Sequence, residues 1–137
     1  MRDDGTMFVF GGYNNSGELS NEIYSYHVKE KLWQREKVMS DFAPQPRAGH
    51  SCVIIKNKLF IFGGKGEDSK KLNDYWTFDT MLNYWERVEV EAPINAWNPS
   101  ERSGHSVLVY QGNIVMFAGI RSVLQELGDL YVYETDQ

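Results

Sequence analysis

A short apolar run that ends in a pair of glycines recurs along this chain, and it constrains the fold more than any other feature. Residues 7–12 (MFVFGG) return as residues 59–64 (LFIFGG) and, with alanine in place of the first glycine, as residues 114–119 (IVMFAG). The second glycines of the runs lie 52 and 55 residues apart. A period of this length is typical of repeat architectures in which each copy is one supersecondary unit.

Other landmarks keep the same spacing. An aromatic residue follows each second glycine by 14 residues, and a tryptophan follows the first two by 21 residues. Two matching segments, residues 47–51 (RAGHS) and 102–106 (RSGHS), precede the second and third runs. We expect a structural role for the recurring residues Gly11, Gly12, Gly63, Gly64, Gly119, Tyr26, Phe78, Tyr133, Trp33, Trp85, His50 and His105. The aromatic residues among them, both tryptophans included, are expected in the core between repeats.

Each unit has the pattern of four short strands, which in the second copy are residues 50–55, 59–64, 73–79 and 84–88. No segment shows a helical period. Many short strands separated by close turns indicate an all-β fold. A four-stranded unit that repeats about every fifty residues favours a β-propeller over a sandwich or a closed barrel.

These motifs resemble kelch repeats, and the resemblance covers nearly the whole chain. It implies a β-propeller in which each repeat forms one blade, a four-stranded antiparallel meander. The third-strand segments, LNDYWTF at residues 72–78 and LGDLYVY at residues 127–133, are similar to kelch proteins of the leucine-zipper-like regulator and host-cell-factor type rather than the BTB-linked type. Ala118 departs from the glycine pair, so we expect either extended backbone there or a local adjustment of the third blade.

The repeat divides the chain into parts of one incomplete propeller. Residues 1–38 supply strands two to four of a first blade, residues 47–90 supply all four strands of a second, and residues 102–137 supply strands one to three of a third. Propellers close with about four to eight blades. The open blade edges therefore imply missing blades in a longer chain or self-association.

The glycine- and lysine-rich stretch at residues 59–71 comes close to a dinucleotide-binding fingerprint. That fingerprint needs a following helix, and none is indicated here. The glycine pair also recurs without lysines at residues 11–12. We therefore interpret the glycines as structural, where strand ends turn and blades approach closely.

No candidate catalytic constellation stands out, and we expect neither a metal nor a cofactor. His50 and His105 lack a third ligand at metal-binding spacing. Cys52 is the only cysteine, and we expect it to be a small core residue. The kelch resemblance also suggests a galactose-oxidase-like copper enzyme as a third functional candidate, but no spacing of residues supports such a site.

Recognition is expected on one face of the propeller. In a four-stranded meander, the loop between strands two and three and the connection from strand four to the next blade lie on the same face, and these segments are long here. Long loops on a rigid scaffold carry most binding sites. The candidate partner-binding residues on or near this long-loop face are Arg47, Arg102, Arg121, Trp97, Phe42, Lys65 and Lys70.

Alternative roles stay open for some of these candidates. Arg47 and Arg102 are included because kelch proteins often point such arginines toward the central opening, but both could instead donate to carbonyls between blades. Phe42 and Trp97 fall outside the repeat pattern, as binding hot spots do, and either could simply cover a blade edge.

Composition narrows the choice of partner. A net charge of −5 argues against nucleic acid, which needs clustered cations. Apolar runs of about five residues are too short to span a membrane. We expect a non-catalytic module that binds a protein or peptide, as the recognition part of a larger protein of the cytoplasm or nucleus, such as a ubiquitin-ligase adaptor. The alternative is a regulatory kelch domain of a multidomain enzyme such as a kelch-bearing Ser/Thr phosphatase.

Overall fold

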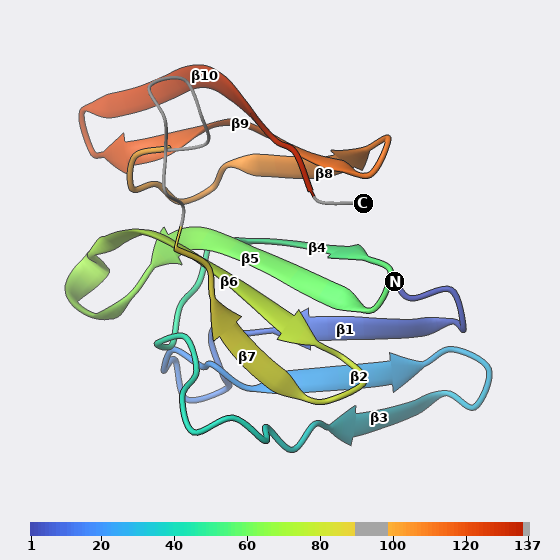
Figure 1. The fold of residues 1–137 in the computed structure, drawn as a ribbon. Coiled ribbons are helices and arrows are strands. Elements are labelled where there is room, and N and C mark those ends of the chain that lie inside the picture. Colours follow the sequence, from blue (N-terminus) through green and yellow to red (C-terminus); the bar gives the residue numbers. More distant parts are fainter. Residues whose placement is uncertain (90–98, 136–137) are drawn as a thin grey trace.

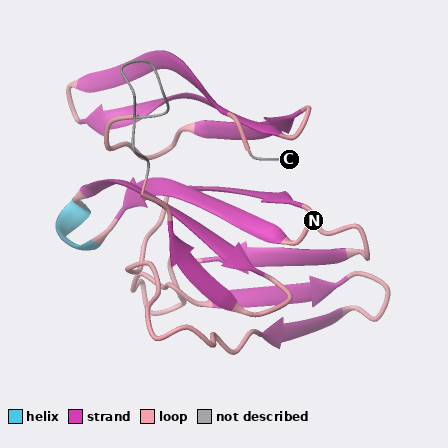
Figure 2. Ribbon diagram, viewed as in Figure 1, coloured by secondary structure: helices cyan, strands magenta, loops and turns pink. Residues whose placement is uncertain are grey.

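The computed structural model describes residues 1–89 and 99–135, and its strands form three antiparallel sheets (Figures 1 and 2). We call them blades 1, 2 and 3. Their strands are β1 (Thr6–Phe10), β2 (Ile23–His27) and β3 (Leu32–Arg35); β4 (Ser51–Ile55), β5 (Lys58–Lys65), β6 (Lys71–Asp79) and β7 (Tyr84–Arg87); and β8 (Ser106–Tyr110), β9 (Asn113–Ser122) and β10 (Gln125–Tyr133). Neighbouring strands in each sheet are consecutive in sequence. The expected all-β fold of meander blades is confirmed.

The three sheets stack face to face, with blade 2 in the middle (Figure 1). Because side chains alternate along a strand, blade 2 presents apolar residues to both neighbours. One side of it, which includes Ile61, Phe78 and Trp85, packs against Phe10 and Ile23 of blade 1. The other side packs against blade 3 through a second cluster made of Phe62, Tyr75, Ile114 and Met116. Blade 2 therefore belongs to two hydrophobic cores.

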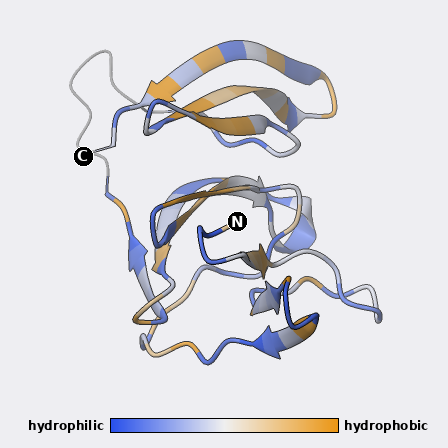
Figure 3. Ribbon diagram, turned by 90° about the vertical axis from the view of Figure 1, so that its right-hand side faces the viewer, coloured by the Kyte–Doolittle hydropathy of each residue, from blue (hydrophilic) through white to orange (hydrophobic). Residues whose placement is uncertain are grey.

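Large apolar side chains are also exposed on blades 1 and 3, among them Val9, Leu108 and Phe117. Figure 3 colours the hydrophobic segments of the strands orange. This exposure corrects the expectation that both repeated tryptophans lie in inter-blade core. Trp85 is fully buried against Phe10 of the preceding blade, whereas Trp33 is 59% exposed and contacts the half-buried Tyr26. The difference arises because no other sheet of the described residues covers that side of blade 1.

The glycine pairs lie at the seams between blades. Gly63 has φ +64°, and a Cβ there would come within 2.9 Å of the carbonyl oxygen of Arg102 in blade 3. Ala118, at the same place in blade 3, has φ +60°. Both expectations for Ala118 were wrong, because the residue is not extended and its backbone keeps the conformation of Gly63. The left-handed backbone strains alanine at this position. Its side chain nevertheless fits, because among the described residues no further blade packs against it.

The short connections gather on one side of the sheets, where the turns β2–β3, β4–β5 and β8–β9 lie (Figure 1). The opposite side carries a 3₁₀ turn at Glu67–Ser69 and the tip of the β9–β10 hairpin. The sequence suggested a long loop at the hairpin, but both strands extend and leave only a two-residue turn, Val123 and Leu124. Cys52 is exposed on β4 and is not the core residue that we expected. Within the described residues, no helix is long and apolar enough to cross a membrane.

Candidate functional site

Arg47 lies buried at the seam between blades, and its guanidinium group makes four hydrogen bonds. It donates to the carbonyl oxygens of Gln45 (3.2 Å) and Gly63 (3.0 Å), and it grips both carboxylate oxygens of Asp74 at 2.6 and 2.7 Å. The carboxylate also accepts from the indole N–H of Trp76 at 2.7 Å. Burial alone would raise the pKa of Asp74, but the hydrogen bonds and charge of Arg47 lower it, so the pair stays ionised.

Arg102 repeats this arrangement in blade 3. Its guanidinium donates to the carbonyl oxygens of Ser100 and Ala118, and it contacts both carboxylate oxygens of Asp129 at 2.5 and 2.9 Å. Neither arginine has any exposed side-chain surface. Their inclusion among the partner-binding candidates is therefore corrected: each arginine fastens its own blade from within, because a bidentate pair satisfies the buried charge.

The backbone of each arginine joins two blades. The carbonyl oxygen of Arg47 accepts from the N–H of Gly12 in blade 1, and that of Arg102 accepts from the N–H of Gly64 in blade 2, both at 2.8 Å. A side chain on the first glycine of either pair would push against the same carbonyl. The arginines and the glycine pairs thus form one seam that is repeated at both blade junctions.

The two histidines belong to the same seam. His50 packs edge-on against Phe10 with ring centroids 5.1 Å apart, and His105 packs likewise against Phe62 at 5.6 Å. Burial lowers the pKa of each imidazole to about 4, and the nearby arginine charges act in the same direction. Both rings are therefore neutral at neutral pH. Among residues 1–89 and 99–135, no group of three or more His, Cys, Asp or Glu residues could hold a metal ion.

Two of the predicted partner-binding residues contact aromatic rings of their own chain. The ammonium group of Lys65 lies 5.8 Å from the ring centroid of Tyr13 in the preceding blade. Phe42, in the connection from blade 1 to blade 2, packs against Trp76 and edge-on against Tyr84, yet about half of it stays exposed. Phe42 thus covers the outer part of blade 2 while keeping a surface for contact.

Lys70 and Arg121, which are distant in sequence, lie together at a groove on the long-loop face. The groove has a volume of about 570 Å³ and separates the 3₁₀ loop of blade 2 from the β9–β10 hairpin of blade 3, which lie at the left in Figure 1. Its rim has three cations, Lys70, Lys71 and Arg121, against one acid, Glu101. Trp97 lies outside the described residues.

The groove has neighbours that the sequence did not single out. Val123 and Leu124, at the tip of the β9–β10 hairpin, are 99% and 97% exposed. The ammonium group of Lys71 donates to the hydroxyl oxygen of Ser103 at 2.6 Å and so links the two blades beneath the groove. Two adjacent aliphatic residues between polar neighbours, in a segment interpreted as a loop, were the available signal for the hairpin tip.

The chain was compared with known protein families. The chain matches the model of the KLHDC2/KLHL20/DRC7 Kelch-repeats domain over residues 1–137. The chain belongs to the kelch-repeat family. The three sheets are accordingly kelch-type blades of an incomplete propeller, and the arginine, histidine and glycine landmarks lie where one kelch blade meets the next.

Several curated proteins are similar to this kelch chain. The Rho GTPase-activating protein gacHH of Dictyostelium discoideum is 34% identical over 88% of the chain, which covers 8% of that protein. Host cell factor of Drosophila melanogaster is 31% identical over 95% of the chain and 10% of its own length. The leucine-zipper-like transcriptional regulator 1 homolog of Drosophila melanogaster is 32% identical over 82% of the chain and 12% of its own length.

The resemblance to host-cell-factor and leucine-zipper-like kelch proteins is thus confirmed. The chain spans about a tenth of the length of these relatives.

Proposed function

We propose that this kelch chain is a non-catalytic interaction module that binds a protein or peptide through its long-loop face. Its relatives are long proteins in which the matching part is a small share, which supports a role as the recognition part of a larger protein of the cytoplasm or nucleus. A ubiquitin-ligase adaptor is one such protein. No nucleic acid or membrane is part of the proposal, because the chain is acidic overall.

The observation that carries the proposal is the cationic groove between blades 2 and 3. Three cations and one acid give it a positive rim on a chain whose net charge is −5. Exposed Val123 and Leu124 beside it offer apolar contact at low polar desolvation cost. The sheets beneath hold both loops in place, because rigid elements position binding loops. A partner segment with acidic and apolar side chains fits this surface best.

The test is a selection from displayed random peptides with the full chain, followed by affinity measurement on variants. We expect Lys70→Glu with Arg121→Glu to weaken the selected peptides at least about tenfold, since each lost charge contact is worth roughly 1 kcal/mol or more. Lys29→Glu with Lys31→Glu makes the same charge change on the short-turn side and should leave binding intact. Equal binding to the Lys70 and Arg121 double variant would exclude this groove.

A regulatory kelch domain of a multidomain enzyme is the second candidate. It is supported by the similarity to gacHH, which is named as a GTPase-activating protein. A kelch-bearing Ser/Thr phosphatase would be another protein of this kind. The full-length sequence distinguishes this role from an adaptor, because an enzyme domain would be found in the same chain.

The exposed outer faces also predict a partner. Val9, Tyr24 and Trp33 on blade 1 and Leu108 and Phe117 on blade 3 leave apolar surface open to solvent. Surfaces of this kind are normally covered. We propose that further blades of a longer chain cover them, with self-association as the alternative. A concentration-dependent mass in sedimentation of the full-length protein would favour self-association, and a constant monomer mass would favour further blades.

A further inference from the structure

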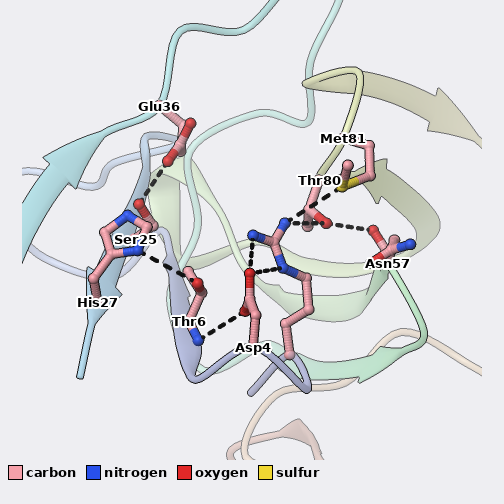
Figure 4. A network of polar contacts seen from close by, with 9 residues as sticks. Asp4, Thr6, Ser25, His27, Glu36, Asn57, Thr80 and Met81 are labelled. Atoms are coloured by element: carbon pink, nitrogen blue, oxygen red, sulfur yellow. Dashed lines mark hydrogen bonds and ion pairs between the residues drawn. The ribbon is translucent and has the colours of Figure 1, made fainter. Parts of the chain in front are cut away.

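On the short-turn side, the junction between blades 1 and 2 is filled by an arginine. The backbone N–H of Arg2 donates to the carbonyl oxygen of Thr6, which places Arg2 beside the start of β1. Its guanidinium carbon lies 5.4 Å from the centroid of the Phe8 ring. The same group donates to the hydroxyl oxygen of Thr80 in blade 2 at 3.3 Å and to the carboxylate of Asp4 at 2.6 Å (Figure 4).

Among residues 1–89 and 99–135, no side chain fills the equivalent junction between blades 2 and 3. A pocket of about 570 Å³ lies there, lined by Phe60 and Thr135 among others. Phe60 is the repeat counterpart of the ring beneath the arginine, and Thr135 is the counterpart of the threonine that accepts from it. Ile55 pairs with Lys58 across the β4–β5 turn and so takes the place of Arg2. Isoleucine is shorter and uncharged, which leaves the space that a guanidinium group fills at the first junction.

At the open pocket, cationic side chains stand where the first junction has an acid. Lys56 lies in the β4–β5 turn, where the turn before β1, longer by one residue, carries Asp4, the acid that holds the arginine; Lys58 also lines the pocket. The carboxylate of Asp79 accepts from the backbone N–H groups of the two residues at 81 and 82, so it is engaged in closing its own turn. Lys58 forms an ion pair with Glu86 at 3.9 Å, in which both side chains are exposed, and it also pairs with Asp79 across β5 and β6. An exposed pair at this distance contributes little.

We propose that this inter-blade pocket binds a carboxylate carried on an apolar or aromatic stem. The stem lies on Phe60 and Ile55, and the carboxylate lies between the ammonium groups of Lys56 and Lys58. The volume falls within the usual range of about 300–1,000 Å³ for small-ligand sites, which combine an apolar floor with a few polar groups. The carboxylate comes either from a free acid or from an acidic side chain of a peptide. This site faces away from the cationic groove and is independent of it.

The test uses two small probes of opposite charge on the full chain labelled with ¹⁵N. Phenylacetate should shift the amide resonances of Asn57, Gly112 and Thr135 in a saturable titration, whereas benzamidine should not. Capped Phe-Asp dipeptide amide is the peptide arm: saturation tighter than with phenylacetate identifies a peptide as the source, and weaker saturation identifies a free acid.

Lys56→Asp restores the charge found at the first junction. We expect it to weaken phenylacetate at least about tenfold, as loss of one charge-assisted contact does, and to allow benzamidine to bind. Lys31→Asp is the matched control, because Lys31 and Lys56 both have φ of 55° and lie in short turns on this side. Absence of saturable shifts at the three amides, or equal phenylacetate affinity in both variants, would overturn the proposal.

Discussion

Gly63→Ala tests whether the glycine pair is required by contact between blades. The added Cβ would lie 2.9 Å from the carbonyl oxygen of Arg102 and 3.2 Å from that of Leu72, and φ is +64°. The left-handed conformation costs alanine about 1–2 kcal/mol. Lower chain entropy in the unfolded state offsets about 0.4–1 kcal/mol of this. Overpacking against a backbone that cannot rotate away adds about 1–3 kcal/mol.

The net expectation is a loss of about 3 kcal/mol in the free energy of unfolding. The seam bond from the N–H of Gly64 to Arg102 at 2.8 Å would be displaced as well. Urea unfolding, followed by tryptophan fluorescence, measures the change. With a slope of about 1–3 kcal/mol per molar urea, the midpoint should fall by roughly 1–3 M.

Ala118→Gly is the reverse change at the repeat-equivalent position. Since φ there is already +60°, glycine relieves the same backbone strain, with no blade contact to gain or lose among the described residues. We expect the free energy of unfolding to rise by about 0.5–1 kcal/mol, which is strain relieved less the unfolded-state entropy. If Gly63→Ala loses no more than Ala118→Gly gains, contact with blade 3 plays no part and the reasoning is refuted.

Three further outcomes are expected from denaturation measurements. Asp74→Asn should cost about 3–5 kcal/mol, since it strands a buried guanidinium group, and a cost under 1 kcal/mol would contradict the assigned ion pair. Trp85→Ala should cost about 3–5 kcal/mol, and Trp33→Ala, a matched change at an exposed position, under about 1 kcal/mol; equal costs would contradict the burial difference. Because folding lowers the pKa of His50 and His105 to about 4 from about 6.5, the unfolded state binds more protons between these values, so stability should fall as pH drops from 6.5 to 4. His105→Gln should reduce the fall in unfolding free energy between pH 6.5 and pH 4 by up to about 3 kcal/mol. Urea titrations at several pH values measure this fall, and an equal fall in the variant would contradict the prediction.

Much of the fold was predictable because the repeat aligns three copies of one pattern. The spacing of the glycine pairs and aromatic residues indicated meander blades, and the strands lie where apolar runs and turns alternate. The acidic partners of the buried arginines could also have been predicted from the sequence. Asp74 and Asp129 each follow their arginine by 27 residues, and this shared spacing was a signal that the sequence reading did not use.

The burial of each candidate residue could not be predicted from the sequence. Arg47 and Trp33 both recur with the repeat, yet the first is fully buried and the second largely exposed. A period specifies which residues are equivalent within a blade, but burial also depends on what packs against that blade. Lys70 and Arg121 posed a similar problem, because their approach depends on how two loops from different blades bend.

The sequence by itself determined the unit: four short strands, a glycine pair, and an arginine and histidine ahead of the first strand. These are local properties, set by the alternation of side chains along strands and by the turns between them. Only the tertiary structure decided how one unit meets the next. The guanidinium of Arg2 fills one junction, and its replacement by Ile55 opens the other, because contacts between blades depend on side-chain length and charge at positions that no local pattern distinguishes.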